Sequence, residues 1–272
     1  MIMDGKSVAK KIRQDIKQEI SGMKVKPGLA VVQVGDNAAS NVYIRLKEKA
    51  CKEVGIDLRL VKLQESVPEE RLLADIEKLN DDDRIHGMLV QLPLPKHINV
   101  ERVLSAVDPD KDVDGFNPVN VGLLAVGEPR FVPATPKGVM RLLDEYKIPI
   151  EGRNAVVVGR SNIVGKPLAA MLLARHATVT ICHSRTKDLV EVTKRADILA
   201  VAVGRPGMIK KEHVKKGAVV VDVGITEVDG NLKGDVAFDE VEPIASHITP
   251  VPGGVGPMTI AMLLESTKEA AK

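Results

Sequence analysis

The chain has 272 residues, of which 44% are hydrophobic and 28% are charged, the balance of an ordinary globular protein with room for two domains. A formal net charge of +2, the absence of Trp and an aromatic content of 2% give no basis for binding nucleic acid or a membrane surface. Two widely separated cysteines, a charged N-terminus and the lack of a long apolar run predict a cytoplasmic protein without a membrane span.

The first half of the chain alternates between predicted helices and strands. Apolar residues recur at every fourth position from Val8 to Ile20, which predicts an amphipathic helix over residues 6–21. The next elements are predicted strands at 29–35, 56–63 and 85–95, with helices from near Ser40 and over 69–81. This alternation predicts a parallel sheet with helices on its faces.

The second half predicts another α/β unit. Residues 108–122 are rich in Asp, Asn, Pro and Gly and are predicted to form a long loop. Thr135, followed by proline, is the expected N-cap of a helix over 135–148. Four strands are predicted at 154–159, 177–182, 197–204 and 217–224. A Pro/Gly-rich loop at 248–259 leads into a final helix from Pro257, and the six scattered histidines predict no metal site.

A strand, a tight glycine turn and a helix are predicted in NAVVVGRSNIVGKPLAAMLL, an arrangement that places phosphates against helix N-terminal amides. The turn departs from G-x-G-x-x-G, because Ser161 takes the second glycine position and Gly165 comes one residue late. An ordinary strand–turn–helix therefore remains an alternative. The next strand ends in CHSRT, without the acid that would repel a 2′-phosphate. Ser184 and Arg185, with Arg160, would attract that phosphate, which predicts NADP.

Three lysines fall within six positions of the helix that begins near Ser40. The predicted apolar arc of this helix consists of Val42, Leu46, Ala50 and Val54. Lys49 and Lys52 turn toward water, whereas Lys47 lies at the edge of the arc, with Tyr43 inside it one turn earlier. A lysine partly removed from water has a lowered pKa and can exchange protons near neutrality. The alternative is a snorkelling side chain whose ammonium stays in solvent.

Three other features favour ligand binding. Gln91 follows Val90 at the carboxyl end of a strand, where open α/β sheets bind ligands, although an amide that caps a loop is an equal alternative. Asp114 in DVDGF either fixes a turn or accepts paired N–H bonds from a heterocycle. The glycines from Pro252 to Gly256 let backbone approach a flat ligand closely, which favours ligand contact over a purely structural turn.

These motifs together resemble one family. In the order found in the methylenetetrahydrofolate dehydrogenase/cyclohydrolase family, the chain contains YIRLK, KACKEVGI, GMLVQLPLP, DPDKDVDGF, PATPKGV, VVVGRSNIVGKP, TVTICHSRT, DVGI, GDVAF and ITPVPGGVGPMT. The resemblance implies two α/β domains and a homodimer formed through the cofactor domain. Residues 1–134 would form a folate-binding catalytic domain that takes back the C-terminal helix 257–272. Residues 135–256 would form a Rossmann-type NADP-binding domain.

The resemblance also implies an activity and a set of site residues. The activity is NADP-dependent oxidation of 5,10-methylenetetrahydrofolate to the 5,10-methenyl compound, followed by hydrolysis to 10-formyltetrahydrofolate. The implied catalytic residues are Lys47, Tyr43 as its positioning and substrate-stacking neighbour, Gln91 as its polar partner and Asp114 as the pterin-binding acid. The other implied substrate contacts are Val90, Leu92, Pro252, Gly253, Gly254, Val255 and Gly256. The implied cofactor contacts are Gly159, Arg160, Ser161, Ser184, Arg185 and Ile225. The rival hypotheses are a monofunctional dehydrogenase and a folate- or nucleotide-binding protein without turnover.

Overall fold

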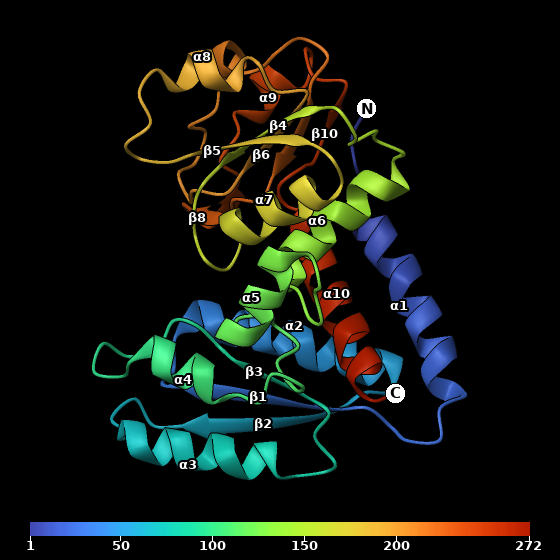
Figure 1. Cartoon of the computed structure of the whole chain (residues 1–272), viewed down its shortest axis with the longest axis vertical. Coiled ribbons are helices and arrows are strands. Elements are labelled where there is room, and N and C mark those ends of the chain that lie inside the picture. Colours follow the sequence, from blue (N-terminus) through green and yellow to red (C-terminus); the bar gives the residue numbers. More distant parts are fainter. The chain divides into compact units, whose positions relative to one another are not determined.

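The computed structural model describes residues 1–272, apart from the side chain of Ala39 (Figure 1). Contacts divide the chain into two compact units, each built from two stretches of sequence. One consists of Met1–Ala9 and Thr135–Thr259, and the other of Lys10–Ala134 and Ile260–Lys272. We call them the Gly159 unit and the Lys47 unit. The assignment of folate and cofactor roles to residues 1–134 with 257–272 and to residues 135–256 stays a prediction.

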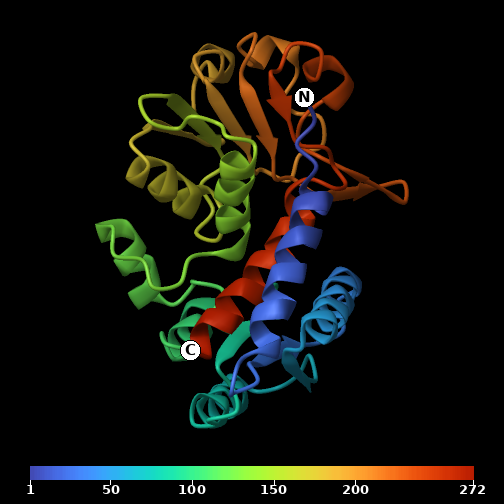
Figure 2. The same ribbon diagram turned by 90° about the vertical axis from the view of Figure 1, so that its right-hand side faces the viewer.

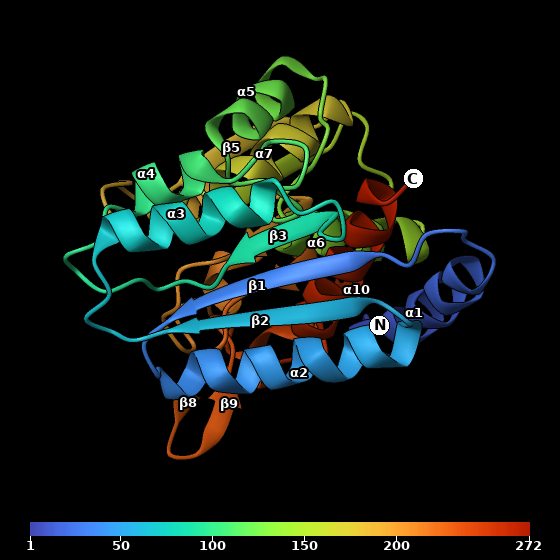
Figure 3. The same cartoon turned by 90° about the horizontal axis from the view of Figure 1, so that it is seen from below.

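A three-stranded parallel sheet forms the centre of the Lys47 unit, with the strand order β2-β1-β3. Its strands are β1 (Gly28–Val34), β2 (Asp57–Leu63) and β3 (Gly87–Val90). Every residue of β1 is buried, as expected for the central strand of a covered parallel sheet. Helices α2 (Ala38–Val54) and α3 (Glu69–Asn80) run alongside the sheet (Figure 3). Strand β3 is shorter than predicted, because the prolines that follow it cannot donate ladder hydrogen bonds.

The parts of α1 (Gly5–Ser21) and α10 (Val255–Ala270) that belong to the Lys47 unit lie side by side (Figure 2). The four apolar residues of α1 from Val8 to Ile20 are each at most 8% exposed, which confirms the predicted amphipathic helix. The ammonium of Lys268 on α10 donates a hydrogen bond to the carboxylate of Glu19 on α1 at 2.7 Å. Helix α10 begins two residues before the predicted start, because proline is tolerated throughout a first helical turn, where amides lack intrahelical partners.

Two short helices of the Lys47 unit were not predicted. Helix α4 (Val100–Ala106) follows Asn99, whose side chain accepts from the amide of Arg102 at 3.1 Å. Helix α5 (Pro118–Val126) occupies the end of the predicted 108–122 loop. Its N-cap is Asn117, whose side chain accepts from an amide of the first turn at 2.8 Å. The loop prediction was wrong there because Asn and Pro, which favour loops, also start helices.

A five-stranded parallel sheet forms the centre of the Gly159 unit, with the strand order β10-β7-β6-β4-β5. Its strands are β4 (Asn154–Val158), β5 (Thr178–Cys182), β6 (Ile198–Val201), β7 (Val219–Asp222) and β10 (His247–Ile248). Its helices are α6 (Ala134–Glu145), α7 (Gly165–Ala174), α8 (Leu189–Thr193) and α9 (Phe238–Val241). The two units confirm the predicted α/β fold class. Because the strands are parallel, the segments that follow them meet at one edge of the sheet.

Two local features of the Gly159 unit complete the fold. Helix α6 begins at Ala134, so the prediction of Thr135 as its N-cap was wrong by two residues. An antiparallel hairpin of β8 (Thr226–Val228) and β9 (Asn231–Lys233) follows β7. Its turn consists of Asp229 and Gly230, both with positive φ, the conformation that two-residue hairpin turns favour.

Candidate active site

Helix α2 turns a different face to the interior from the one predicted. Val42 is 54% exposed and Leu46 is 46% exposed, so half of the predicted apolar arc was wrong. The buried side chains on α2 include those of Ser40, Ile44, Ala50, Cys51 and Val54. The predicted and observed arcs share Ala50 and Val54, and only packing against the rest of the unit decides between two such overlapping arcs.

Lys47 lies on the buried stripe of α2. A helical rotation of about 100° per residue places Lys47 between Val54 and Cys51 on the helix circumference. Its side chain is partly buried, whereas Lys49 and Lys52 are exposed as predicted. The difference in burial between Lys47 and the two exposed lysines is therefore larger than the predicted position at the edge of the arc implied.

Gln91 holds Lys47 from the end of β3. The Lys47 ammonium donates a hydrogen bond to Oε1 of Gln91 at 3.0 Å. Gln91 is fixed in turn, because its backbone amide donates to the carbonyl of Val32 at 2.8 Å and its Nε2 donates to the carbonyl of Leu92 at 2.9 Å. Oε1 remains an acceptor for both the ammonium and the neutral amine, each of which has N–H donors. The same amide thus fills the loop-capping role and contacts the lysine.

Two acids of the loop between α4 and α5 have different surroundings. Asp112 accepts hydrogen bonds from the amide of Asn117 at 2.8 Å and from Nδ2 of Asn120 at 2.9 Å. Asp114 has no hydrogen bond or ion pair within the described part of the chain. The role of fixing the turn therefore belongs to Asp112, which was not predicted, and the carboxylate of Asp114 is left available for a ligand.

Lys47 and Asp114 influence each other without a direct ion pair between the described atoms. Burial lowers the pKa of the Lys47 ammonium, and the nearby Asp114 carboxylate opposes this shift. Burial raises the pKa of the Asp114 carboxyl to about 6, and Lys47 opposes that shift. Both groups therefore titrate closer to neutrality than exposed groups do, which is typical of residues that exchange protons in a reaction.

Cys51 lies one turn after Lys47 and was not predicted to take part in the site. Burial raises the pKa of its thiol to about 12, so Cys51 stays neutral and adds no charge beside the amine. It packs on the same stripe of α2 and is fully buried. The spacing of four residues between Lys47 and Cys51 is the sequence feature that could have predicted their neighbouring positions on α2.

The remaining residues predicted around Lys47 differ in exposure. Tyr43, one turn before Lys47, is 38% exposed, so its prediction as part of the buried arc was wrong. That exposure leaves ring surface accessible for stacking on a flat ligand. Val90 ends β3 and is buried, and Leu92 is partly buried. The structure thus brings Lys47, Gln91 and Asp114 within electrostatic reach, with Tyr43 adjacent on α2.

The glycine turn after β4 depends on close backbone packing. Gly159 has a φ of +130°, and an ideal Cβ there would lie 2.3 Å from the carbonyl oxygen of Ala202. An ideal Cβ on Gly165 would lie 2.2 Å from the carbonyl oxygen of Gly159, so this glycine lets α7 approach the strand. The hydroxyl of Ser161 accepts from the amides of Val164 and Gly165 at 3.1 and 3.3 Å. A serine in place of the second glycine thus supplies an acceptor for two amides at the start of α7, whose N-cap is Val164.

The turn that follows β5 lies beside the glycine turn. Val158 pairs with Cys182 in the sheet, and the amide of Gly159 donates to the carbonyl of Cys182 at 2.9 Å. The His183–Thr186 turn is closed by its own hydrogen bonds, and Ser184 and Arg185 are exposed on it. Arg160, the residue after Gly159, is exposed as well. Two cationic side chains therefore flank the turns that follow β4 and β5.

The loop from Pro252 to Gly256 belongs to the Gly159 unit, where it contacts Ile225. An ideal Cβ on Gly256 would lie 3.2 Å from Cδ1 of Ile225. Gly253 has a φ of +109°, a conformation that favours glycine. A small pocket of about 10 Å³ is lined by Asp222, Val223, Ile225 and residues 250–256. A residue predicted to bind the cofactor thus lies against the loop predicted to bind the substrate, although Val255 and Gly256 start α10.

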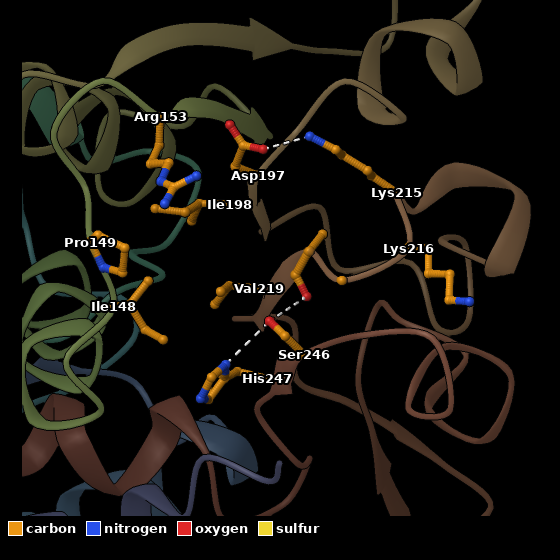
Figure 4. Close-up of a pocket in the computed structure, with 12 residues that line it drawn as sticks. Ile148, Pro149, Arg153, Asp197, Ile198, Lys215, Lys216, Val219, Ser246 and His247 are labelled. Atoms are coloured by element: carbon orange, nitrogen blue, oxygen red, sulfur yellow. Dashed lines mark hydrogen bonds and ion pairs between the residues drawn. The ribbon is translucent and has the colours of Figure 1, made fainter.

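The described residues also form a cavity away from the predicted site. A cavity of about 260 Å³ opens at the amino ends of β4, β6, β7 and β10, where Arg153 and His247 line it and Lys215 pairs with Asp197 (Figure 4). It includes none of the predicted site residues.

Among the described residues, no cluster of three or more His, Cys, Asp or Glu side chains is placed to hold a metal. No described helix combines the length and apolarity needed to cross a bilayer.

Comparisons with known proteins assign both parts of the chain. Residues 3–114 match the catalytic domain of tetrahydrofolate dehydrogenase/cyclohydrolase, and residues 133–272 match the NAD(P)-binding domain of the same family. The chain is 55% identical to the bifunctional protein FolD of Halalkalibacterium halodurans, with 100% of the chain and 99% of that protein covered.

Solved structures give the same assignment. The bifunctional FolD enzyme of Campylobacter jejuni is 49% identical, with a TM-score of 0.98 over 100% of this chain and 98% of that one. The enzyme of Trypanosoma brucei, solved with NADP cofactor and inhibitor, is 40% identical, with a TM-score of 0.96 and coverages of 100% and 97%. The chain therefore belongs to the tetrahydrofolate dehydrogenase/cyclohydrolase family.

Proposed function

We propose that this protein oxidises 5,10-methylenetetrahydrofolate with NADP and hydrolyses the resulting 5,10-methenyltetrahydrofolate to 10-formyltetrahydrofolate. The observation that carries the proposal is the setting of Lys47. Its side chain is partly buried and hydrogen-bonded to Gln91, and it lies near the carboxylate of Asp114, which has no hydrogen-bond partner among the described residues. Because burial lowers the pKa of its ammonium, Lys47 can act as an acid and, once neutral, as a base. The names of the bifunctional relatives support the same pair of reactions.

Oxidation removes a hydride from the one-carbon bridge of the folate. The lone pairs of the two folate nitrogens expel the hydride, because the methenyl product is an amidinium cation, so Lys47 would assist this step by holding the bridge in place without protonating either nitrogen. NADP, when bound, accepts the hydride. We assign its binding to the Gly159, Arg160 and Ser161 turn, to Ser184 and Arg185, and to Ile225. The phosphates would lie against the Gly159–Ser161 turn that precedes α7, and the two arginines would attract the 2′-phosphate.

Hydrolysis adds water to the methenyl carbon and opens the bridge. Neutral Lys47 would take a proton from the attacking water, so the oxygen adds to carbon as the proton passes to Nζ. The bond from that carbon to one folate nitrogen then breaks as the hydroxyl becomes the formyl carbonyl. The proton on Lys47 passes to the departing nitrogen, and the hydroxyl proton leaves to solvent. Gln91 holds Nζ in place in both protonation states, Asp114 would accept N–H bonds from the pterin, and Tyr43 would stack on the ring.

We also infer a homodimer formed through the Gly159 unit and a cytoplasmic location. Strand β5 lies at an edge of the five-stranded sheet, and its Ile181 is 40% exposed. Leu173 on the adjoining α7 is 63% exposed, so apolar surface is available beside that edge. Cys51 and Cys182 are both free and buried, which suits a reducing compartment.

One optical assay tests the activity. The purified protein is supplied with methylenetetrahydrofolate and either NADP or NAD, and methenyl formation and decay are followed. We expect methenyl to form with NADP and then to decay faster than it does without enzyme. Methenyl that persists at its uncatalysed rate would identify a monofunctional dehydrogenase. The absence of any signal would leave only a binding protein.

Cofactor preference should depend on Arg185. Replacing Arg185 with alanine removes a charged partner for the 2′-phosphate, and a charged hydrogen bond contributes about 1.5–3 kcal/mol. We therefore expect kcat/KM for NADP to fall roughly 10- to 100-fold, with little change for NAD, in steady-state assays. Arg195→Ala, which removes another exposed arginine of the same unit, is the control. Equal losses with both cofactors in Arg185→Ala would contradict the assignment.

A further inference from the structure

Two buried acids of the Gly159 unit have no role in the proposed reaction. Asp222 ends β7 in the DVGI motif and is 3% exposed. Asp235 belongs to the GDVAF motif and is fully buried. Buried carboxylates are costly unless they are hydrogen-bonded, so their partners show what they do.

Asp235 binds the backbone that follows β6. Its Oδ2 accepts from the amides of Val203 at 2.7 Å and Gly204 at 3.0 Å. Its Oδ1 accepts from the amide of Arg205 at 2.6 Å. Three consecutive backbone amides thus converge on one carboxylate, which fixes the 203–205 segment more firmly than a loop without such an anchor.

Asp222 binds the segments on either side of the hairpin. Its Oδ1 accepts from the amides of Gly224 and Asp235, each at 3.0 Å, and its Oδ2 accepts from the amide of Val236 at 2.9 Å. The two acids are therefore linked, because Asp222 holds the backbone that carries Asp235. An ideal Cβ on Gly224 would lie 2.2 Å from the carboxyl carbon of Asp235, so this packing requires glycine.

The segments held by these acids lie between the two groups of residues assigned to the cofactor. Strand β6 has β4 on one side and β7 on the other. On the β4 side, the amide of Ala202 donates to the carbonyl of Val158 at 2.8 Å, beside the Gly159 turn. On the β7 side, the amide of Val223 donates to the carbonyl of Val201 at 2.8 Å, two residues before Ile225.

We propose that Asp235 and Asp222 are positioning residues that hold the carboxyl edge of β6 and β7 in the shape required by the nicotinamide half of NADP. This inference rests on the proposed function. The 2′-phosphate residues lie at the ends of β4 and β5, so an extended dinucleotide places its other half across β6 and β7. Backbone that is already ordered does not have to be ordered during binding, so affinity is gained without direct contact to the cofactor.

An isosteric substitution tests the role of Asp235. Asp235→Asn keeps the shape of the side chain but turns an amide N–H toward backbone N–H groups, which removes at least one acceptor. We expect KM for NADP to rise about tenfold, equivalent to about 1.4 kcal/mol, with KM for methylenetetrahydrofolate within about twofold of wild type. Asp239→Asn, an exposed acid four residues along the chain, should leave both values unchanged.

The outcomes separate this inference from the proposed function. Hydrolysis of methenyltetrahydrofolate requires no hydride acceptor, so its rate shows whether the Asp235→Asn protein is folded and active. An unchanged KM for NADP, or an equal change in both KM values, would overturn the positioning role alone. A wild-type protein that does not oxidise methylenetetrahydrofolate with NADP would overturn the proposed function and this inference together.

A measurement on the wild-type protein removes the dependence on a variant that folds. Without cofactor, we expect the amides of Val203, Gly204 and Arg205 to exchange hydrogen at least about tenfold more slowly than those of the exposed Asp229–Gly230 turn, because stable hydrogen bonds limit exchange. Exchange as fast as in that turn until NADP is added would show that binding, not the carboxylate, orders the segment, and would overturn the inference.

Discussion

Replacing Lys47 with methionine is expected to abolish hydrolysis of methenyltetrahydrofolate and to leave NADP binding nearly unchanged. Methionine is close to lysine in length and keeps the apolar packing between Val54 and Cys51, so the change removes the amine and little else. General acid–base catalysis contributes about 10²- to 10⁴-fold, which sets the size of the expected loss in rate. The decay of methenyl absorbance measures hydrolysis, and cofactor-induced thermal stabilisation measures NADP binding.

Lys49→Met provides the matched control for this prediction. Lys49 lies two residues further along α2 and is exposed, so its loss should leave the hydrolysis rate within about twofold of wild type, as for most surface substitutions. A Lys47→Met protein that hydrolyses methenyltetrahydrofolate at the wild-type rate would refute the catalytic role. A variant that also fails to bind NADP would show a general loss of structure instead.

Replacing Asp114 with asparagine is expected to weaken folate binding and to shift the pH dependence of hydrolysis. The carboxylate would accept paired N–H bonds from the pterin, and the loss of a charged acceptor costs about 1.5–3 kcal/mol. KM for the folate should therefore rise roughly 10- to 100-fold. Asp83→Asn, which changes an exposed loop acid of the same unit, should leave KM unchanged.

The direction of the pH shift follows from the pKa changes in the site. Asp114 loses its proton as the pH rises through about 6, and the carboxylate then raises the pKa of Lys47. Asparagine carries no charge at any of these pH values, so the pKa of Lys47 falls further below its usual range. Since neutral Lys47 is the base, the rising limb of hydrolysis against pH should move to lower pH in Asp114→Asn. A limb that stays in place or moves upward in a pH–rate profile would contradict the coupling.

The sequence predicted most helices and strands because their signals are local. The amphipathic spacing from Val8 to Ile20 and the apolar strands of the glycine-turn motif depend only on neighbouring residues. It missed α5, since Asn117 and Pro118 are typical both of loops and of helix starts. Such a choice depends on what the following residues can pack against.

In the candidate site, too, local signals predicted some features and tertiary packing decided others. The sequence alone identified Lys47 as different from Lys49 and Lys52, because their positions around a helix differ regardless of what the helix packs on. It could not choose between the arc through Val42 and Leu46 and the stripe through Ile44 and Cys51. Both arcs are apolar enough to be buried, and contacts with the rest of the unit decide between them.

The distinction between Asp112 and Asp114 also required the tertiary structure. Both lie in one loop and have the same chemistry, but Asp112 is occupied by Asn117 and Asn120 whereas Asp114 is left near Lys47. The sequence by itself determined the α/β class and, through its motifs, the family. Only the tertiary structure decided which acids bind backbone, as Asp112 and Asp235 do, and which remain free, as Asp114 does. The reason is that hydrogen-bond partners and burial come from segments far apart in the chain.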